Sequence, residues 1–338
     1  MPAISGQIEF YKIYLRGANN NYTFRNFAKD YCYEGGEDHP DDNSLFIALF
    51  NKLLNQFDSH VNRYDDLKKG VSIYHADGVE ANAILSIATD QKVIQGFLDG
   101  GYFGLKRNMS DLDKSNLTEI TTDKIVTDRY YVYMYYPFDS NIAILMIEKR
   151  GNLTISKVVC NVLEAFFENQ NNNISSHAER FIPRSMVQTF KQGAVIDQLT
   201  YSRQVSSAVL GEGVVDNPEL YDVTIQIKPR SEEYSYDRLN ALIGRLNTMT
   251  FSVFGHEFNL GGFTTKKGKL RSEGSSSKPS FDIENQSIRV VKPIPQEFYD
   301  EFNTLDRDRM KEFCGGLLRE LSAEVYPVAP VEQNDGVQ

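Results

Sequence analysis

The chain has no tryptophan, three cysteines and five histidines among its 338 residues. Cys32, Cys160 and Cys314 are too far apart for a C-x-x-C metal site or a disulfide framework, which favours a reducing cytosol. No two histidines stand at i, i+4 or in an H-x-H arrangement, so a histidine-based metal cluster is not indicated. We therefore expect neither a metal centre nor a cofactor.

Long hydrophobic runs are also missing. The longest uncharged stretch, around residues 142–147, is far shorter than the roughly 20 residues that span a bilayer. The N-terminus lacks the basic start and apolar run of a signal peptide. No P-loop, G-x-G-x-x-G or G-x-S-x-G motif is present. These absences predict a cytoplasmic protein with no membrane segment, and they favour binding over catalysis.

The chain is rich in residues that form packed sheets. Hydrophobic residues make up 41% of it, and there are 19 Tyr and 21 Phe. The formal charge is -10, from 46 acidic and 36 basic residues. This excess of acid argues against broad, non-specific binding of nucleic acid, although a local basic patch can still bind it.

The clearest local pattern is a β-hairpin over residues 128–151, followed at once by an amphipathic helix near residues 158–167. Strands and helices alternate without strict βαβ order, which predicts an α+β fold. The length predicts two mixed domains, each a mainly antiparallel sheet with helices packed on it.

The domain boundary is predicted from the polar run ENQNNNISS at residues 168–176. We expect an N-terminal domain over residues 1–167, a linker over 168–180 and a C-terminal domain over 181–327. The last helix, near residues 304–325, is expected to cover the sheet of the C-terminal domain. Residues 328–338 are expected to form a flexible tail.

One catalytic hypothesis rests on Asp139, Glu148 and Lys149, which follow the layout of metal-dependent PD-(D/E)xK nucleases. There, two carboxylates hold Mg²⁺ and the lysine steadies the attacking water. Nine residues of straight strand would separate the two acids by roughly 30 Å, at about 3.3 Å per residue. The alternative is that Asp139 is a turn residue and that residues 148–150 form a solvated strand end.

A second candidate is the segment KKGKLRSEGSSSK, interpreted as a mobile hairpin tip that contacts a phosphate backbone. Its basic residues, opposed by the single acid Glu273, are Lys266, Lys267, Lys269, Arg271 and Lys278. The alternatives are a solvated loop and a contact with an acidic partner protein.

A third candidate is a row of tyrosines. Tyr131, Tyr133 and Tyr135 fall on one face of the first hairpin strand. If exposed, such a row can stack on single-stranded bases or form a protein interface. The alternative is packing in the core.

Residues 128–150, together with KQGAVIDQLTYSRQ from Lys191, resemble uncharacterised bacterial proteins that occur near genome-defence (antiphage) genes. The resemblance implies an antiviral setting, and it carries no catalytic motif and no residue roles.

Three hypotheses follow. The first is a sensor or adaptor in antiviral defence that binds nucleic acid through the basic segment and the tyrosine face. The second is the metal-dependent nuclease. The third is a non-catalytic subunit that contacts a partner protein through the acidic loop at residues 30–42. A homo-oligomer is compatible with each.

Overall fold

A computed structural model describes residues 6–17, 21–35, 40–168, 174–191, 194–206, 220–230, 235–253, 256–271, 280–284 and 291–326. The chain divides into two compact units. The first comprises Met1–Phe181 and Lys292–Gln338, and the second comprises Ile182–Val291. The second unit is therefore an insertion in the sequence of the first.

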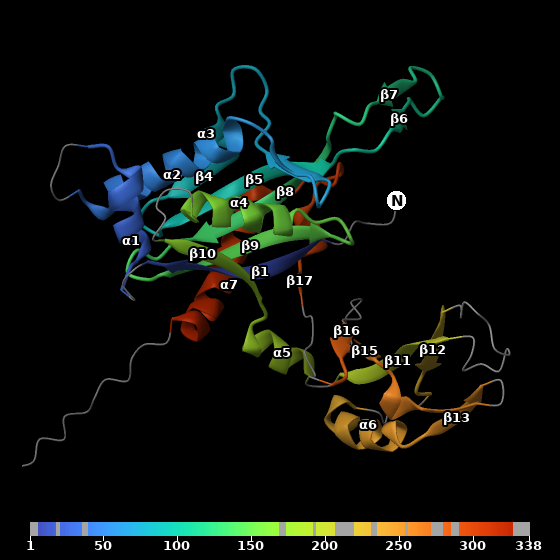
Figure 1. The fold of residues 1–338 in the computed structure, drawn as a ribbon. Helices are drawn as coiled ribbons and strands as arrows, with labels where there is room; N and C mark the ends of the chain where they lie inside the picture. Colours follow the sequence, from blue (N-terminus) through green and yellow to red (C-terminus); the bar gives the residue numbers. More distant parts are fainter. Residues whose placement is uncertain are drawn as a thin grey trace, which may run out of the picture. The chain divides into compact units, whose positions relative to one another are not determined.

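The first unit is built on a nine-stranded antiparallel sheet (Figure 1). The strand order is β10-β1-β9-β8-β5-β3-β2, with β17 also beside β1 and β4 also beside β5. The strands are β1 (Gly6–Arg16), β2 (Asn62–Tyr64), β3 (Lys69–Ser72), β4 (Leu85–Ala88), β5 (Val93–Tyr102), β8 (Val126–Tyr135), β9 (Ile142–Arg150), β10 (Ser175–Phe181) and β17 (Lys292–Pro293). A separate hairpin joins β6 (Arg107–Met109) to β7 (Thr118–Ile120).

Helices cover both faces of this sheet. They are α1 (Phe24–Phe27), the π-helix η1 (Ala28–Cys32), α2 (Asp42–Asp58), α3 (Ala81–Ile84), α4 (Ser156–Glu168), the 3₁₀ helix η5 (Gln296–Phe298) and α7 (Arg307–Val325). Helix α2 begins where the Asp41 carboxylate accepts hydrogen bonds from the backbone N–H groups of Asn43 and Ser44, at 2.8 and 3.1 Å. The predicted hairpin and the helix after it are present as β8, β9 and α4.

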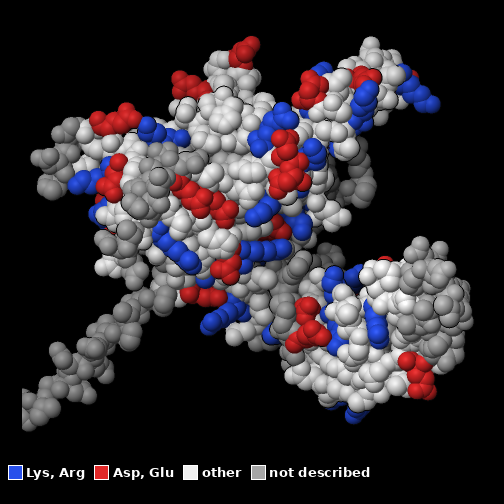
Figure 2. Space-filling model, viewed as in Figure 1, with Lys and Arg blue, Asp and Glu red and all other residues white. Residues whose placement is uncertain are grey.

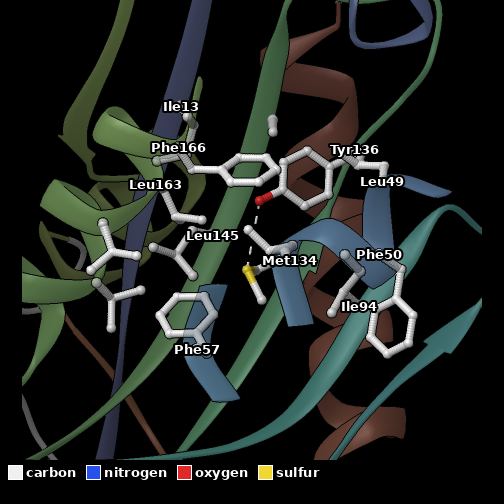
Figure 3. Packing of buried hydrophobic residues seen from close by; sticks show 14 of the residues in the cluster. Ile13, Leu49, Phe50, Phe57, Ile94, Met134, Tyr136, Leu145, Leu163 and Phe166 are labelled. Carbon is white, nitrogen blue, oxygen red and sulfur yellow. Dashed lines mark hydrogen bonds between the residues drawn. The ribbon is translucent and has the colours of Figure 1, made fainter. Parts of the chain in front are cut away.

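One face of the sheet packs against α2 and α4, and the side chains between them form the main core (Figure 3). Phe57 of α2 and Leu163 of α4 are fully buried beside Leu145 of β9. The Tyr136 hydroxyl, at the end of the hairpin strand, donates to the sulfur of Met134 at 3.6 Å. The periodic apolar face predicted for α4 is thus the face that is buried, and α2 buries an apolar face in the same way.

The other face of the sheet is covered by α7, which lies opposite α4 (Figure 1). Arg307, at the start of α7, donates to the carbonyl oxygens of Ala83 at 2.6 Å and Gln95 at 3.5 Å. At its end, the Tyr326 hydroxyl donates to the carbonyl oxygen of Ile142 at 2.8 Å. The prediction that the last helix covers the C-terminal sheet is wrong, because α7 packs on the first unit.

The second unit has a four-stranded antiparallel sheet in the order β12-β11-β15-β16 and a two-stranded pair, β13-β14. Its elements are α5 (Arg184–Lys191), β11 (Val195–Ser206), β12 (Leu220–Ile227), the 3₁₀ helix η3 (Tyr236–Arg238), α6 (Leu239–Asn247), β13 (Thr250–Val253), β14 (His256–Asn259), the 3₁₀ helix η4 (Leu260–Gly262), β15 (Thr265–Arg271) and β16 (Ser280–Asp282). Its own core includes Leu199, Tyr201, Leu239, Leu260 and Leu270. Both units are α+β, as predicted.

Several segments differ from expectation. Residues 175–180, expected within the linker, form β10 together with Phe181, and this strand pairs with Arg16–Phe10 of β1. The apolar run at residues 81–88 divides into α3 and β4, because a short apolar run does not distinguish helix from strand by its period. Residues 285–290, after β16, lie outside the described part. The expected tail, from residue 328, also lies outside it.

No helix in the described ranges is both long and apolar enough to cross a membrane.

Candidate nucleic-acid interface

The first part of the basic segment forms a strand instead of a loop, and residues 272–278 lie outside the described part. Residues 265–271 make β15, an inner strand between β11 and β16. Its composition resembles a loop, but its side chains alternate: Gly268 and Leu270 are buried, while Lys267 and Lys269 are exposed. A Cβ on Gly268 would lie 2.1 Å from the ring of Phe281, so the glycine makes room for that ring to cross the strand.

Three of the five predicted cations share one side of this sheet, which we call the basic face. It is defined by the exposed side chains Lys267, Lys269 and Arg271 of β15, with Gln198 and Thr200 of β11 and Thr224 and Gln226 of β12 beside them. Opposite residues of antiparallel strands point to the same side, and the registers Lys267↔Thr200 and Thr200↔Gln226 place these side chains together. Figure 2 shows Lys and Arg side chains on the surface of the second unit.

Hydrogen bonds between neighbouring side chains hold the polar groups of this face. Gln198 Nε2 donates to Thr200 Oγ1 at 2.9 Å, and the hydroxyls of Ser202 and Thr224 lie 3.1 Å apart. The cations stand two residues apart, so their Cα atoms are about 6.7 Å apart along the strand. Asp282 is opposite Lys267 on β16 and is an acid on this side.

The other two predicted cations do not join this group. Lys266 points to the opposite side of β15, where its side chain is 9% exposed and its ammonium lies 2.9 Å from the Glu284 carboxylate. Lys278 lies outside the described residues. Within the described residues, three of the cations predicted on a mobile tip therefore lie in a row on a strand.

The predicted tyrosine face belongs to the first unit and is covered. Tyr131 and Tyr133 lie on one face of β8 as predicted, but both are buried. The Tyr131 hydroxyl donates to Gln95 Oε1 at 2.5 Å, and burial raises the pKa of Tyr133 to about 12. Tyr135 is half-buried, with its ring 6.0 Å from that of Tyr326 on an edge-on approach. Because both rings are buried, bases cannot stack on Tyr131 or Tyr133. The apolar residues on both faces of the strand were the indication in the sequence that this strand is buried.

The three nuclease candidates are not brought together. Asp139 is 89% exposed in the hairpin turn, where its carboxylate lies 2.7 Å from the Arg25 guanidinium. Glu148 is fully buried, near the other end of β9. Lys149 points to the opposite face of the sheet, 3.5 Å from the buried Glu9. The part of the chain that the structure describes also contains no group of three or more His, Cys, Asp or Glu side chains that could hold a metal ion.

The partners of Glu148 show a structural role. Its carboxylate accepts from the backbone N–H of Tyr131 at 3.0 Å and from Arg150 Nε at 2.6 Å. Arg150 in turn donates to the backbone carbonyl of Arg129 at 2.9 Å. The β8–β9 ladder ends at Val132↔Ile147. Beyond it, the side chains of Glu148 and Arg150 form the hydrogen bonds to the backbone of β8. Burial alone would lower the pKa of Arg150, but the hydrogen bond and charge of Glu148 outweigh it and raise the pKa above its ordinary value.

The acidic loop contributes to helix capping and ion pairing. Asp41 caps α2, and hydrogen bonds from Ser44 hold the pKa of its carboxyl below the ordinary range. The guanidinium of Arg25 bridges Asp42, at 2.8 Å, and Asp139. Sequence reasoning missed Arg25, which lies 114 positions from Asp139 and carries no local signal. Residues 36–39 of the loop lie outside the described part.

The three cysteines are buried and free. Burial raises the pKa of Cys32 and of Cys160 to about 12, and it also raises the pKa of Cys314. Because the thiolate is the reactive form, we expect all three to react slowly with a thiol reagent at about pH 8 in the folded protein and rapidly in urea. Rapid labelling of any one of them before unfolding would contradict this arrangement.

Comparison with models of known protein families and with curated proteins finds no match to this chain. Its function is therefore inferred from the residues themselves.

Proposed function

We propose that the second unit binds nucleic acid through the phosphate backbone, with the basic face as the contact surface, and that the protein acts by binding in the antiviral setting that its sequence resemblance implies. The observation that carries the proposal is the row of exposed cations on an inner strand. Lys267, Lys269 and Arg271 are fixed by the ladders of β15 with β11 and β16. Their backbone is ordered before binding, so association loses less conformational entropy than it would on a mobile loop.

The neighbours of the cations fit the same ligand. Gln198, Thr200 and Thr224 present amide and hydroxyl donors, which are common phosphate ligands alongside Lys and Arg. The chain carries a net charge of -10, so a local row of positive charge stands out from the rest of the surface. Attraction to phosphate therefore falls on this face.

The composition of the face also predicts how it binds. Among the side chains that define the basic face none is aromatic, so base stacking does not add affinity there. Phosphate contacts position a nucleic acid without reading its sequence. We expect weak sequence preference and strong dependence on salt.

The test is charge reversal of two cations on the face. We expect Lys267→Glu combined with Lys269→Glu to weaken binding of a labelled oligonucleotide by at least roughly tenfold at low salt. Losing two phosphate contacts should also flatten the log-salt slope by about 1.8 on duplex or about 1.4 on single strands. Fluorescence anisotropy, titrated at several salt concentrations from about 50 to 300 mM, measures both quantities.

The matched control is Lys29→Glu combined with Lys157→Glu, which makes the same change of charge on exposed helix positions of the first unit. We expect this control to bind like the wild type. Equal weakening in both double variants would assign the effect to net charge, and no binding by the wild type would leave a partner protein as the ligand. Thermal melting of each variant checks the fold.

A further inference from the structure

Strand β12 is an edge strand whose one charged residue is Asp222. Its ladder with β11 runs from Leu199↔Ile227 to Ser206↔Leu220 without a shift in register. In the described part of the second unit, no strand pairs with its outer side. Edge strands commonly carry a lysine, a proline or a bulge that blocks pairing with another chain. The sequence of β12, LYDVTIQI, contains none of these.

The two sides of β12 differ in chemistry. Tyr221, Val223, Ile225 and Ile227 share the side of the core residues Leu199 and Tyr201. Asp222, Thr224 and Gln226 share the side of the basic face. Leu220, at the start of the strand, is 69% exposed. Any strand that pairs with this edge must therefore present apolar residues on one side and polar residues on the other.

Strand β12 has apolar residues on one side and polar residues on the other, so a second copy of β12 meets this requirement. We infer that β12 pairs in antiparallel orientation with β12 of a second copy of the chain, about a twofold axis through Thr224. In this register Val223 is opposite Ile225 of the second copy, and Tyr221 is opposite Ile227. Pairs of β-branched and aromatic residues stabilise antiparallel sheets. A shift by one residue would place apolar side chains against polar ones on both sides.

The polar side fits the same register. Thr224 meets Thr224 of the second copy, a pair that can hydrogen-bond, and Asp222 meets Gln226. Lys228, the exposed residue that follows β12, is then the diagonal neighbour of Asp222 across the interface. An axis through Val223 would instead make the two Asp222 side chains diagonal neighbours, and like charges repel. The axis through Thr224 pairs the whole strand without a clash of charge.

The test uses Thr224→Lys in the full chain. This change places two ammonium groups opposite each other on the axis, while in the single chain it removes only the hydroxyl contact of an exposed side chain with Ser202. We expect the wild type to be a dimer in sedimentation velocity at about 5 to 100 μM, and the variant to be a monomer with a dissociation constant raised by roughly tenfold or more. The matched control is Gln226→Lys, which adds the same charge two residues further on the same side. We expect it to remain a dimer, since its ammonium meets Asp222 of the second copy.

Mixing Thr224→Lys with Thr224→Glu should restore dimers, because opposite charges then meet on the axis. A wild type that stays monomeric at the highest concentration would overturn the inference. It would also be overturned by a Thr224→Lys protein that dimerises as tightly as the wild type, or by a mixture that remains monomeric. Equal melting temperatures of the variants show that the fold is intact.

Discussion

Replacing Glu148 with alanine is expected to lower the free energy of unfolding by about 3 to 5 kcal/mol, which is the range for breaking a buried ion pair from one side. Glu148 is fully buried, and its loss leaves the Arg150 guanidinium and the Tyr131 N–H without their carboxylate partner. Urea unfolding followed by circular dichroism measures the change. A loss below about 1 kcal/mol would show that the pair does not hold β8 and β9 together.

The control for this experiment is Asp139→Ala. Asp139 is exposed, and its contact with Arg25 is a surface ion pair, so we expect a change within about 0.5 kcal/mol. Both residues belong to the nuclease hypothesis, and the structure separates them into one structural and one surface residue. Mg²⁺-dependent cleavage that Asp139→Ala abolishes, with the fold intact, would contradict this separation.

Gly96→Ala is expected to lower the free energy of unfolding by roughly 3 kcal/mol or more. Gly96 lies in β5 opposite Leu85, with a φ of +149°, a conformation that side chains rarely adopt. A Cβ there would lie 2.0 Å from the carbonyl oxygen of Ile84, which is a backbone atom. Backbone strain and steric overlap therefore act together.

The matched control is Gly316→Ala, the same substitution at a position where we expect the free energy of unfolding to rise instead of fall. Gly316 lies inside α7, and nothing lies within 4 Å of the position its Cβ would take. Alanine should therefore stabilise the helix by about 0.5 to 1 kcal/mol. Urea unfolding of the two variants side by side gives both values. Similar effects at the two positions would contradict the close approach of Ile84 to β5.

Local patterns in the sequence predicted the parts of the fold that depend on near neighbours. Alternation accounts for the hairpin of β8 and β9. The helical period accounts for helix α4 and for the buried face of α2. The packing of α7 on the first unit did not follow, because its buried residues carry no information about which of two sheets they meet. The insertion of a whole unit between β10 and β17 is equally invisible to a local pattern.

The local structure of the candidate interface was predicted wrongly, as a loop instead of a strand. A loop was predicted here because charged residues and glycine are rare in strands. The cations at 267, 269 and 271 nevertheless occupy every second position, which is the period of a strand. Long basic side chains can line the exposed side of a strand whose other side is buried, as Leu270 is. Tyr131 and Tyr133 were predicted on the right face, and what the sequence lacked was the identity of the helix that covers them.

The insertion has a consequence for the order in which the protein is completed during synthesis. Phe181, the last residue of β10, is opposite Phe10 of β1, and Lys292 of β17 is opposite Ile8 of the same strand. The chain thus leaves the first unit and returns to it at neighbouring positions. Between these points the ribosome makes the entire second unit, and α7 comes after it. The sheet face that carries Tyr131 is therefore bare while the inserted unit is being made. The described strands of that unit pair only with one another, so it can close first, and the first unit is the last to finish folding.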